Sequence, residues 1–428
     1  MDNASVFLNT QPLTEVAKSI LNALPPSRLS YALGLLIGYP LLNRLLRYRR
    51  LRQMQKQFKY PTRESMAQMT DEEAYEIQKQ VAQLEFPFIF IKSLQFALFK
   101  TYGIPTISSL LTKTSQFSDP ETSLKRYTDT SALVLEMVGN SPTSQRAYAS
   151  FARVRWLHSG YRASGKITDP DMLYTLALFA LEPIRFIDSY EWRQLSDIER
   201  CAIGTFWKSA GDALDVSYEA LPSGPNGFRD GIQWLEEIEA WRLAYEAVQM
   251  VPNVKNREVA DQTAAVLVYM LPRALVPVGM QFVSYMMDDR LRRAMMYDAP
   301  HAFFAGLFSA ALTARKLFVR YLMPPRPDAW RYSPITDDAD ENGRFFLTGW
   351  EAAPYYVKPT FWNRWGPVAW LTWMLGRPVP GDQGEKYYPT GYQIQDVGPK
   401  YFEGKGRKGM DETVEQYKTS RTGKCPFH

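Results

Sequence analysis

A single histidine lies between two arginines in a stretch with the apolar content of a buried helix. Arg155, His158 and Arg162 are spaced three and four residues apart, so they share one face of a helix. An imidazole can supply an axial nitrogen to the iron of a porphyrin, and guanidinium groups can neutralise the propionates. The pattern makes His158 a candidate iron ligand and the two arginines candidate cofactor-binding residues. An ordinary structural histidine explains the same pattern.

A second polar group precedes the first, across a break at residues 139–142. Arg126, Asp129 and Thr130 are also three and four residues apart on one expected helical face. The flanking residues are apolar enough to bury both helices. A carboxylate in such a place can act as a general base or proton relay, and we assign that role to Asp129, with Arg126 setting its charge state. Arg126 is also a candidate partner for porphyrin propionates.

Histidine and cysteine are scarce, which excludes several kinds of metal site. The three histidines are His158, His301 and His428, and the two cysteines, Cys201 and Cys425, are far apart. The sequence contains neither an HExxH motif nor a Cys/His zinc spacing. His301 stands near the start of an apolar helix, where a capping or surface role is expected. Two distant cysteines indicate no disulfide framework and fit a reducing compartment.

Composition indicates a folded protein with an excess of aromatic side chains. Of 428 residues, 46% are hydrophobic, 22% are charged and 14% are aromatic. Such an aromatic content suits a flat or greasy ligand, or contact with a membrane interface. The formal charge of +5 is small for this length, and the basic excess is concentrated in one tract, so nucleic acid is excluded as a partner.

That basic tract follows an apolar run near the N-terminus. Residues 29–43 carry no charge, and seven arginines and lysines then occur between Arg44 and Lys59. We interpret residues 29–59 as an uncleaved single-pass transmembrane anchor with its basic flank. Residues 1–28 are then lumenal and the catalytic domain is cytosolic. The alternative is an amphipathic or buried N-terminal helix with a basic tail.

The remainder predicts an all-α protein, because helical periodicity is found almost throughout and no alternating β pattern occurs. Capping boxes begin helices at Thr70 and Ser196, and Pro183 is expected to interrupt or kink another helix. We expect a helical core over residues 60–330. Residues 331–428 form an irregular, aromatic-rich C-terminal extension that packs on the core or on the membrane interface. Its segment 361–376 holds four of the 11 tryptophans.

An ordered set of short motifs resembles the family of helical haem oxygenases that includes the latex-clearing rubber oxygenases. The motifs are GIP at 103–105, SQFSDP at 115–120, RYTDT at 126–130, RWLH at 155–158, LYTL at 173–176, SDIE at 196–199 and LP at 221–222. The resemblance implies a globin-like, all-helical fold that holds haem b without a covalent link.

A closer resemblance, to fungal members bound to the endoplasmic reticulum, covers nearly the whole chain. It includes PTRESMAQMTDEEA, QLEFPFIF, LHSGYRASGKI, PTFWNRWGP and SRTGKCPFH. It implies an oxygenase of the endoplasmic-reticulum membrane that uses O2. The implied substrate is a prenylated aromatic small molecule, in which a double bond of a farnesyl side chain on a phthalide is cleaved to an aldehyde.

The resemblance also implies residue roles. His158 takes the position of the axial iron ligand, and Arg126 and Thr130 match an Arg-xxx-Thr pair beside the haem, which adds both to the catalytic candidates. The chain departs from the rubber oxygenases at Asp129, where those enzymes have a lysine. A lysine amine can cap the sixth iron position, whereas Asp129 more plausibly accepts a proton or bonds to Arg126.

Two other interpretations remain open. A thiolate-ligated enzyme of the cytochrome P450 kind would need a cysteine in a glycine-rich haem loop, and neither Cys201 nor Cys425 has that context. A non-enzymatic, membrane-anchored helical lipid-binding or scaffold protein would leave His158 with a structural role only.

Overall fold

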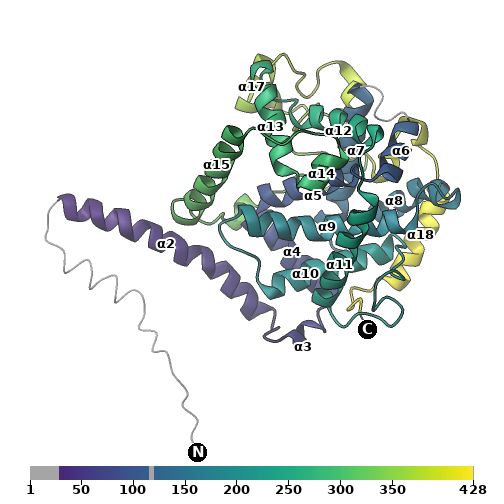
Figure 1. Cartoon of the computed structure of the whole chain (residues 1–428), viewed down its shortest axis with the longest axis horizontal. Coiled ribbons are helices and arrows are strands. Elements are labelled where there is room, and N and C mark those ends of the chain that lie inside the picture. The colour runs from purple at the N-terminus through teal and green to yellow at the C-terminus, as the bar shows by residue number, and fades with distance from the viewer. Residues whose placement is uncertain (1–27, 115–119, 428) are drawn as a thin grey trace, which may run out of the picture.

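The computed structural model describes residues 28–114 and 120–427, and in these ranges the regular structure is helical apart from three isolated β-bridges (Figure 1). The all-α prediction is confirmed, whereas the globin-like arrangement stays a prediction. The predicted lumenal segment, the predicted start of the Arg126 helix at residues 118–119 and His428 lie outside the described residues.

The α-helices are α2 Arg28–Gln57, α3 Arg63–Met66, α4 Asp71–Gln80, α5 Pro87–Thr101, α6 Pro105–Lys113, α7 Pro120–Gly139, α8 Gln145–Ala163, α9 Asp169–Tyr190, α10 Asp197–Ala213, α11 Gly231–Gln249, α12 Val254–Leu267, α13 Val276–Met286, α14 Asp289–Ala294, α15 Ala302–Tyr321, α16 Phe361–Trp365, α17 Pro367–Met374 and α18 Arg407–Ser420.

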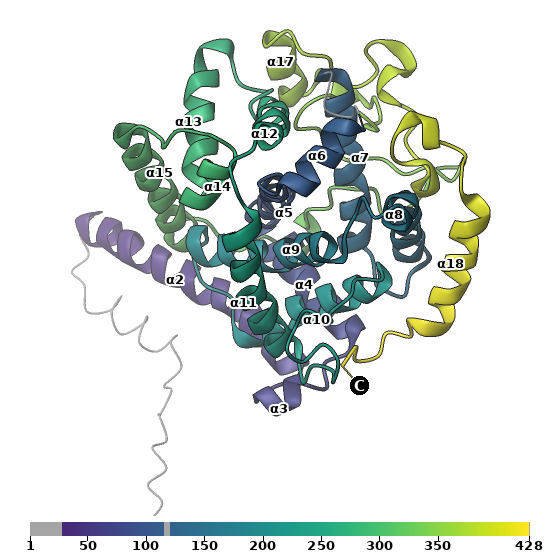
Figure 2. The ribbon, with the colours of Figure 1, turned by 45° about the vertical axis from the view of Figure 1, so that its right-hand side comes forward.

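The core is built around α5 and α9, which pack along each other at the centre of the molecule (Figure 2). Phe90, Leu94 and Ala97 of α5 recur at helical spacing and are buried, as are Leu173 and Ala177 of α9. Helix α10 packs on α4 and α11 to extend this core. Burial of such apolar stripes is the main force that holds the helices together.

Both predicted capping boxes are present. The Glu73 amide donates to Thr70 Oγ1 at 3.2 Å, and the Glu73 carboxylate accepts from the Thr70 amide at 3.1 Å. Ser196 and Glu199 make the same reciprocal pair at the start of α10. Each box satisfies amide groups that the first helical turn cannot pair internally.

Pro183 does not interrupt α9, which continues to Tyr190. Proline removes one backbone hydrogen bond from a helix interior. The three apolar residues that follow it, Ile184, Phe186 and Ile187, are buried in the core. Their burial offsets the lost hydrogen bond, so packing overrides the local preference of the sequence.

The C-terminal extension is more regular than predicted, because α18 packs on α8 (Figure 2). Met410, Val414 and Tyr417 lie on one face of α18 and are buried. The Tyr417 hydroxyl donates to the carbonyl of Ala213 at the end of α10. The extension therefore covers the side of the molecule on which α8 lies.

A buried arginine joins α8 to the segment before α18. The Arg153 side chain is completely buried, and its guanidinium donates to the carbonyl oxygens of Val397 at 2.8 Å, Phe402 at 3.2 Å and Lys405 at 3.3 Å. Three acceptors compensate for the loss of water around a buried cation. This contact fixes residues 397–405 against the middle of α8.

The charge-free run of the predicted anchor forms the first part of α2, which projects from the body of the molecule (Figure 1). Leu35, Leu36 and Ile37 on this part are all at least 60% exposed. By length and composition, α15 is the one unbroken helix in the described ranges that could cross a membrane. The single-pass anchor and its orientation stay predictions.

Candidate active site

The two candidate groups lie on the consecutive helices α7 and α8, which a short turn connects and which pack on each other. Glu136, which is fully buried near the end of α7, accepts two hydrogen bonds from Arg146 at 2.8 and 2.9 Å. Tyr392 of the C-terminal extension donates a third bond to the same carboxylate at 2.7 Å. These bonds fix the register of the pair, and Arg126 and His158 stand at equal distances along their helices from the turn.

His158 has a ring nitrogen that is available to bind a metal. The residue is half-buried, and its Nδ1 atom is buried without a hydrogen-bond partner among the described residues. Burial, and then the positive charges of Arg126 and Arg162, lower the pKa of His158 from 6.5 to about 4. The imidazole is therefore neutral near pH 7 and keeps a lone pair that a metal can accept.

Arg126 is a half-buried cation that forms no ion pair within the described residues. Its guanidinium makes no hydrogen bond or ion pair with any residue in the described ranges, although its charge acts on both His158 and Tyr102. Its backbone carbonyl accepts a hydrogen bond from Thr130 Oγ1 at 2.9 Å. A cation in this position can bind a carboxylate of a ligand.

The two candidate arginines that share a face of α8 with His158 are already paired. Arg162 donates to Asp169 at 3.1 Å and lies 3.5 Å from Asp215. Arg155 lies 3.6 Å from the same Asp215 and is also near Tyr417 of α18. The structure therefore brings Arg126 and Arg162 within electrostatic range of His158, whereas Arg155 is directed toward Asp215 and Tyr417.

Asp129 belongs to a different environment, formed with the C-terminal extension. Lys125 Nζ lies 2.9 Å from one of its carboxylate oxygens, and the Tyr356 hydroxyl donates to the other at 2.7 Å. Lys125 also donates to the carbonyl of Gly398 at 2.9 Å. Burial raises the pKa of Asp129, while Lys125, Tyr356 and, to a smaller extent, the charge of Arg126 oppose that rise. The carboxylate can hold or pass a proton through Lys125 and Tyr356.

Sequence reasoning missed both partners of Asp129. The spacing of Lys125 and Asp129, four residues apart on a helix, could have revealed the first. No local pattern could have revealed Tyr356, which is 227 residues away. Its backbone has a φ of +63°, a conformation that is unusual for a residue with a side chain.

Thr130 faces away from Asp129, toward α5 and α9. It lines a cavity of about 40 Å³ with mostly apolar neighbours, which include Leu98, Val134 and Phe179. The space is about that of one water molecule in the liquid. Thr130 therefore shares α7 with Arg126 and Asp129 but has different surroundings from Asp129.

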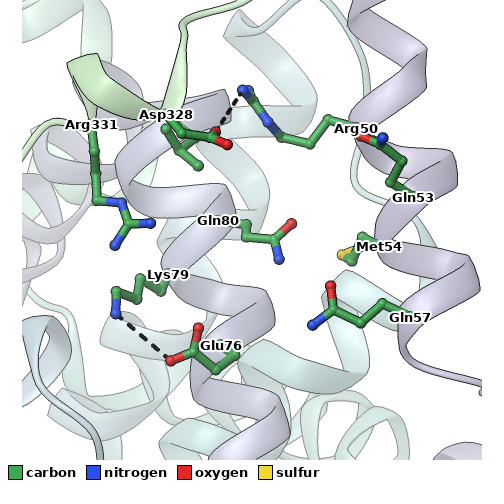
Figure 3. Close-up of a pocket in the computed structure, with 10 residues that line it drawn as sticks. Arg50, Gln53, Met54, Gln57, Glu76, Lys79, Gln80, Asp328 and Arg331 are labelled. Carbon is green, nitrogen blue, oxygen red and sulfur yellow. Dashed lines mark hydrogen bonds and ion pairs between the residues drawn. The ribbon is translucent and has the colours of Figure 1, made fainter.

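A larger pocket lies between α2 and α4, away from these residues (Figure 3). It has a volume of about 380 Å³, and charged and amide side chains line it. Arg50 pairs with Asp328 at 3.3 Å and Lys79 with Glu76 at 3.7 Å. None of its lining residues is a histidine or cysteine, and Met54 is the one lining side chain of a type that can bind haem iron.

The remaining nitrogen and sulfur ligands of the described residues are poorly placed for iron. His301 is the exposed N-cap of α15, and its Nδ1 accepts from the Phe303 amide at 3.2 Å, which confirms its predicted capping role. Cys201 is fully buried, and burial raises the pKa of its thiol to about 11, so the thiolate is disfavoured. No group of three metal-binding side chains occurs in the described part of the chain. A single neutral imidazole, as at His158, is sufficient for haem.

Comparison with known proteins identifies the class. Residues 95–315, which include all of α7 and α8, match the catalytic-domain family described as "ER-bound oxygenase mpaB/B'/Rubber oxygenase". The chain is 64% identical to ER-bound oxygenase mpaB' of Penicillium brevicompactum over 97% of this chain and 98% of that protein. It is 56% identical to ER-bound oxygenase mpaB of the same organism, over 91% of this chain and 94% of the relative.

A third relative, ER-bound oxygenase mpaB of Penicillium roqueforti (strain FM164), is 65% identical over 69% of this chain and 99% of its own length. The chain therefore belongs to the family of ER-bound oxygenases and rubber oxygenases. Membership makes it an oxygenase, and so an oxidoreductase, and confirms the family resemblance seen in its motifs.

Proposed function

We propose that this chain is a haem b-dependent oxygenase of the endoplasmic-reticulum membrane that cleaves a prenyl double bond. The observation that carries this proposal is the neutral His158 beside the cation Arg126: within the described ranges, the buried Nδ1 of His158 has no hydrogen-bond partner and Arg126 forms no ion pair. An axial imidazole and a cation for the propionates are the two groups that a non-covalently bound haem requires. Both lie inside the segment that matches the catalytic-domain family.

The proposed substrate is the farnesyl side chain of a phthalide, a meroterpenoid intermediate of mycophenolic acid biosynthesis. This assignment follows from the close sequence resemblance to fungal members of the family. Addition of one O2 across one C=C bond, followed by its scission, gives two carbonyl groups and accounts for every atom. A substrate with so much hydrocarbon partitions into a bilayer, which gives a membrane-bound enzyme a high local substrate concentration.

The chain's residues have separate tasks in this scheme. Bound haem supplies the dioxygen chemistry. His158 holds the iron from α8, Arg126 binds a propionate, and Arg162, already paired with Asp169, adds positive charge nearby. Asp129 holds or relays a proton, because Lys125 and Tyr356 orient its carboxylate. Thr130 borders the apolar cavity next to α5 and α9.

The test is an ultraviolet–visible spectrum of the detergent-purified full chain, with a pyridine haemochrome assay for stoichiometry. His158→Ala is compared with the matched control His301→Ala, which changes an exposed histidine. We expect a Soret band near unit occupancy in the wild type and the control, and its loss in His158→Ala. Haem retained by His158→Ala would exclude this axial ligand.

Absence of haem from all three proteins would remove the proposed cofactor and the proposed ligand role of His158. A reduced carbon monoxide spectrum separates imidazole from thiolate ligation. The high pKa of the Cys201 thiol leads us to expect the imidazole form.

A further inference from the structure

An exposed apolar surface extends from α2 across α15 to α16 and α17. Helix α15 has 20 residues, and not one of them is buried. Phe303, Leu307 and Phe318 are each about half exposed or more, at 65%, 48% and 53%. Their spacing of four and eleven residues places them on one stripe of the helix. Large exposed apolar patches of this kind indicate a contact with a partner or a membrane.

Helices α16 and α17 carry further exposed apolar side chains. Trp362, Trp370 and Leu371 are 73%, 54% and 56% exposed, and Met374 is 72% exposed. In Figures 1 and 2, α13 lies between α15 at the left and α17 at the top, and α18 lies at the right. Tryptophan is enriched where proteins meet the headgroup layer of a bilayer.

Both ends of α15 are fixed to the rest of the molecule. At its start, the His301 amide donates to the Gln281 side chain of α13 at 2.8 Å. At its end, Asn43 and Arg47 of α2 donate to the carbonyls of Tyr321 at 3.1 Å and Met323 at 2.8 Å. Near that end, Arg315 pairs with Glu191 after α9 at 2.7 Å. A helix held along one face of a body in this way lies in a leaflet more readily than it crosses a bilayer.

The contact with α2 lies where the apolar run of that helix gives way to its basic run. Arg44, Arg49, Arg52 and Lys56 follow this point and are exposed. Anionic lipid headgroups attract such a basic tract. The apolar surface and the basic tract are therefore adjacent. The apolar surface can contact the acyl chains of a bilayer while the basic tract contacts the headgroups.

We propose that α15, together with α16 and α17, forms a second membrane contact that seats the oxygenase body on a phospholipid bilayer. The first part of α2 enters the same leaflet, and the basic tract of α2 contacts the headgroups. The names of the relatives, which describe them as ER-bound, favour a bilayer over a second copy of the chain as the occupant. This contact does not depend on the cofactor or the substrate.

The test uses the full chain in vesicles of phosphatidylcholine and phosphatidylinositol. In a Cys425→Ser background, single cysteines are introduced by Leu307→Cys on α15 and Leu371→Cys on α17, and each is labelled with an environment-sensitive fluorophore. Glu415→Cys on α18 is the matched control, because its side chain is 68% exposed on the opposite side. Cys201 is buried and is not expected to react.

We expect quenchers attached to lipid chains to reduce the emission at 307 and 371 several-fold more than at 415. Aqueous iodide should quench the emission at 415 more than the emission at 307 and 371. Equal lipid quenching at the three positions, or ready iodide quenching at 307 and 371, would refute the membrane contact. Protection of 307 and 371 from both quenchers would also refute it, because a protein partner would then cover the surface. The three labelled positions have exposed side chains, so these substitutions leave the core intact.

Discussion

The Tyr356 hydroxyl donates a 2.7 Å hydrogen bond to the buried carboxylate of Asp129, across 227 residues of sequence. This bond joins the C-terminal extension to the helix that carries Arg126 and Thr130. Lys125 completes the group with its ion pair to Asp129 at 2.9 Å. The candidate proton relay thus depends on a residue outside the segment that matches the catalytic-domain family.

Tyr356→Phe removes the hydroxyl but keeps the ring. We expect the free energy of unfolding to fall by about 1.5–3 kcal/mol, because the bond is to a buried charged group. Urea unfolding of the variant measures this loss. Tyr388→Phe is the control, because the Tyr388 hydroxyl bonds to Glu403 in a less buried place. Equal losses for the two variants would show that the bond to Asp129 contributes no more to the free energy of unfolding than the bond to Glu403.

Asp129→Ala should keep the cofactor and lose turnover. If Asp129 relays a proton, its removal should slow product formation by about 10²–10⁴-fold, the range typical of general acid–base groups. The Soret absorbance, measured in parallel, should be unchanged because His158 is intact. Asp261→Ala, on the exposed face of α12, serves as the control. Normal turnover by Asp129→Ala would exclude the residue from catalysis.

The lowered pKa of His158 predicts an acid-sensitive fold in the haem-free protein. The folded state leaves His158 neutral down to about pH 4, whereas an unfolded histidine binds a proton below its ordinary pKa of 6.5. Unfolding therefore takes up a proton between these limits, and stability falls as the pH falls, by up to about 1.4 kcal/mol per pH unit.

His158→Leu removes this titration, so its stability should fall less than that of the wild type between pH 7 and pH 5. Urea unfolding of both haem-free proteins at the two pH values provides the comparison. Arg126 and Arg162 are unchanged in the variant, so the difference isolates the imidazole. Parallel losses in the two proteins would contradict a neutral, buried His158.

Arg146→Ala should destabilise the α7–α8 pair strongly. It leaves the fully buried carboxylate of Glu136 with Tyr392 and Asn140 but no cation, and an uncompensated buried charge costs about 3–5 kcal/mol. Denaturant unfolding measures the loss. The control is Arg257→Ala, whose ion pair with Asp261 is nearly half exposed and should contribute no more than about 1 kcal/mol. A loss no larger than that of the control would refute the stabilising role of the Glu136 pair.

The sequence could predict what local patterns determine. Thr70 with Glu73, and Ser196 with Glu199, marked helix starts because capping boxes act over three residues. The spacing of His158 and its neighbouring arginines placed them on one helix. The sequence could not show that Arg155 is directed toward Asp215 and Tyr417, because those contacts depend on how α18 packs.

Long-range packing decided the points that local patterns missed. The helix α9 continues past Pro183 because the residues after it are buried. Helix α18 was missed because its apolar positions are few, and only Met410, Val414 and Tyr417 face the core. The sequence placed Asp129 beside Arg126 alone. In the structure, Lys125 and Tyr356 bind its carboxylate in a buried group.

The position of Arg153 limits how the protein can be divided for study. Its three carbonyl partners lie at residues 397–405, whereas the match to the catalytic-domain family ends at residue 315. A fragment truncated at that end point would lose the acceptors of Arg153 and the buried face of α18, and it would expose to water the side of α8 that they cover. The boundary that sequence comparison draws around the catalytic domain is therefore not the boundary of the packed core.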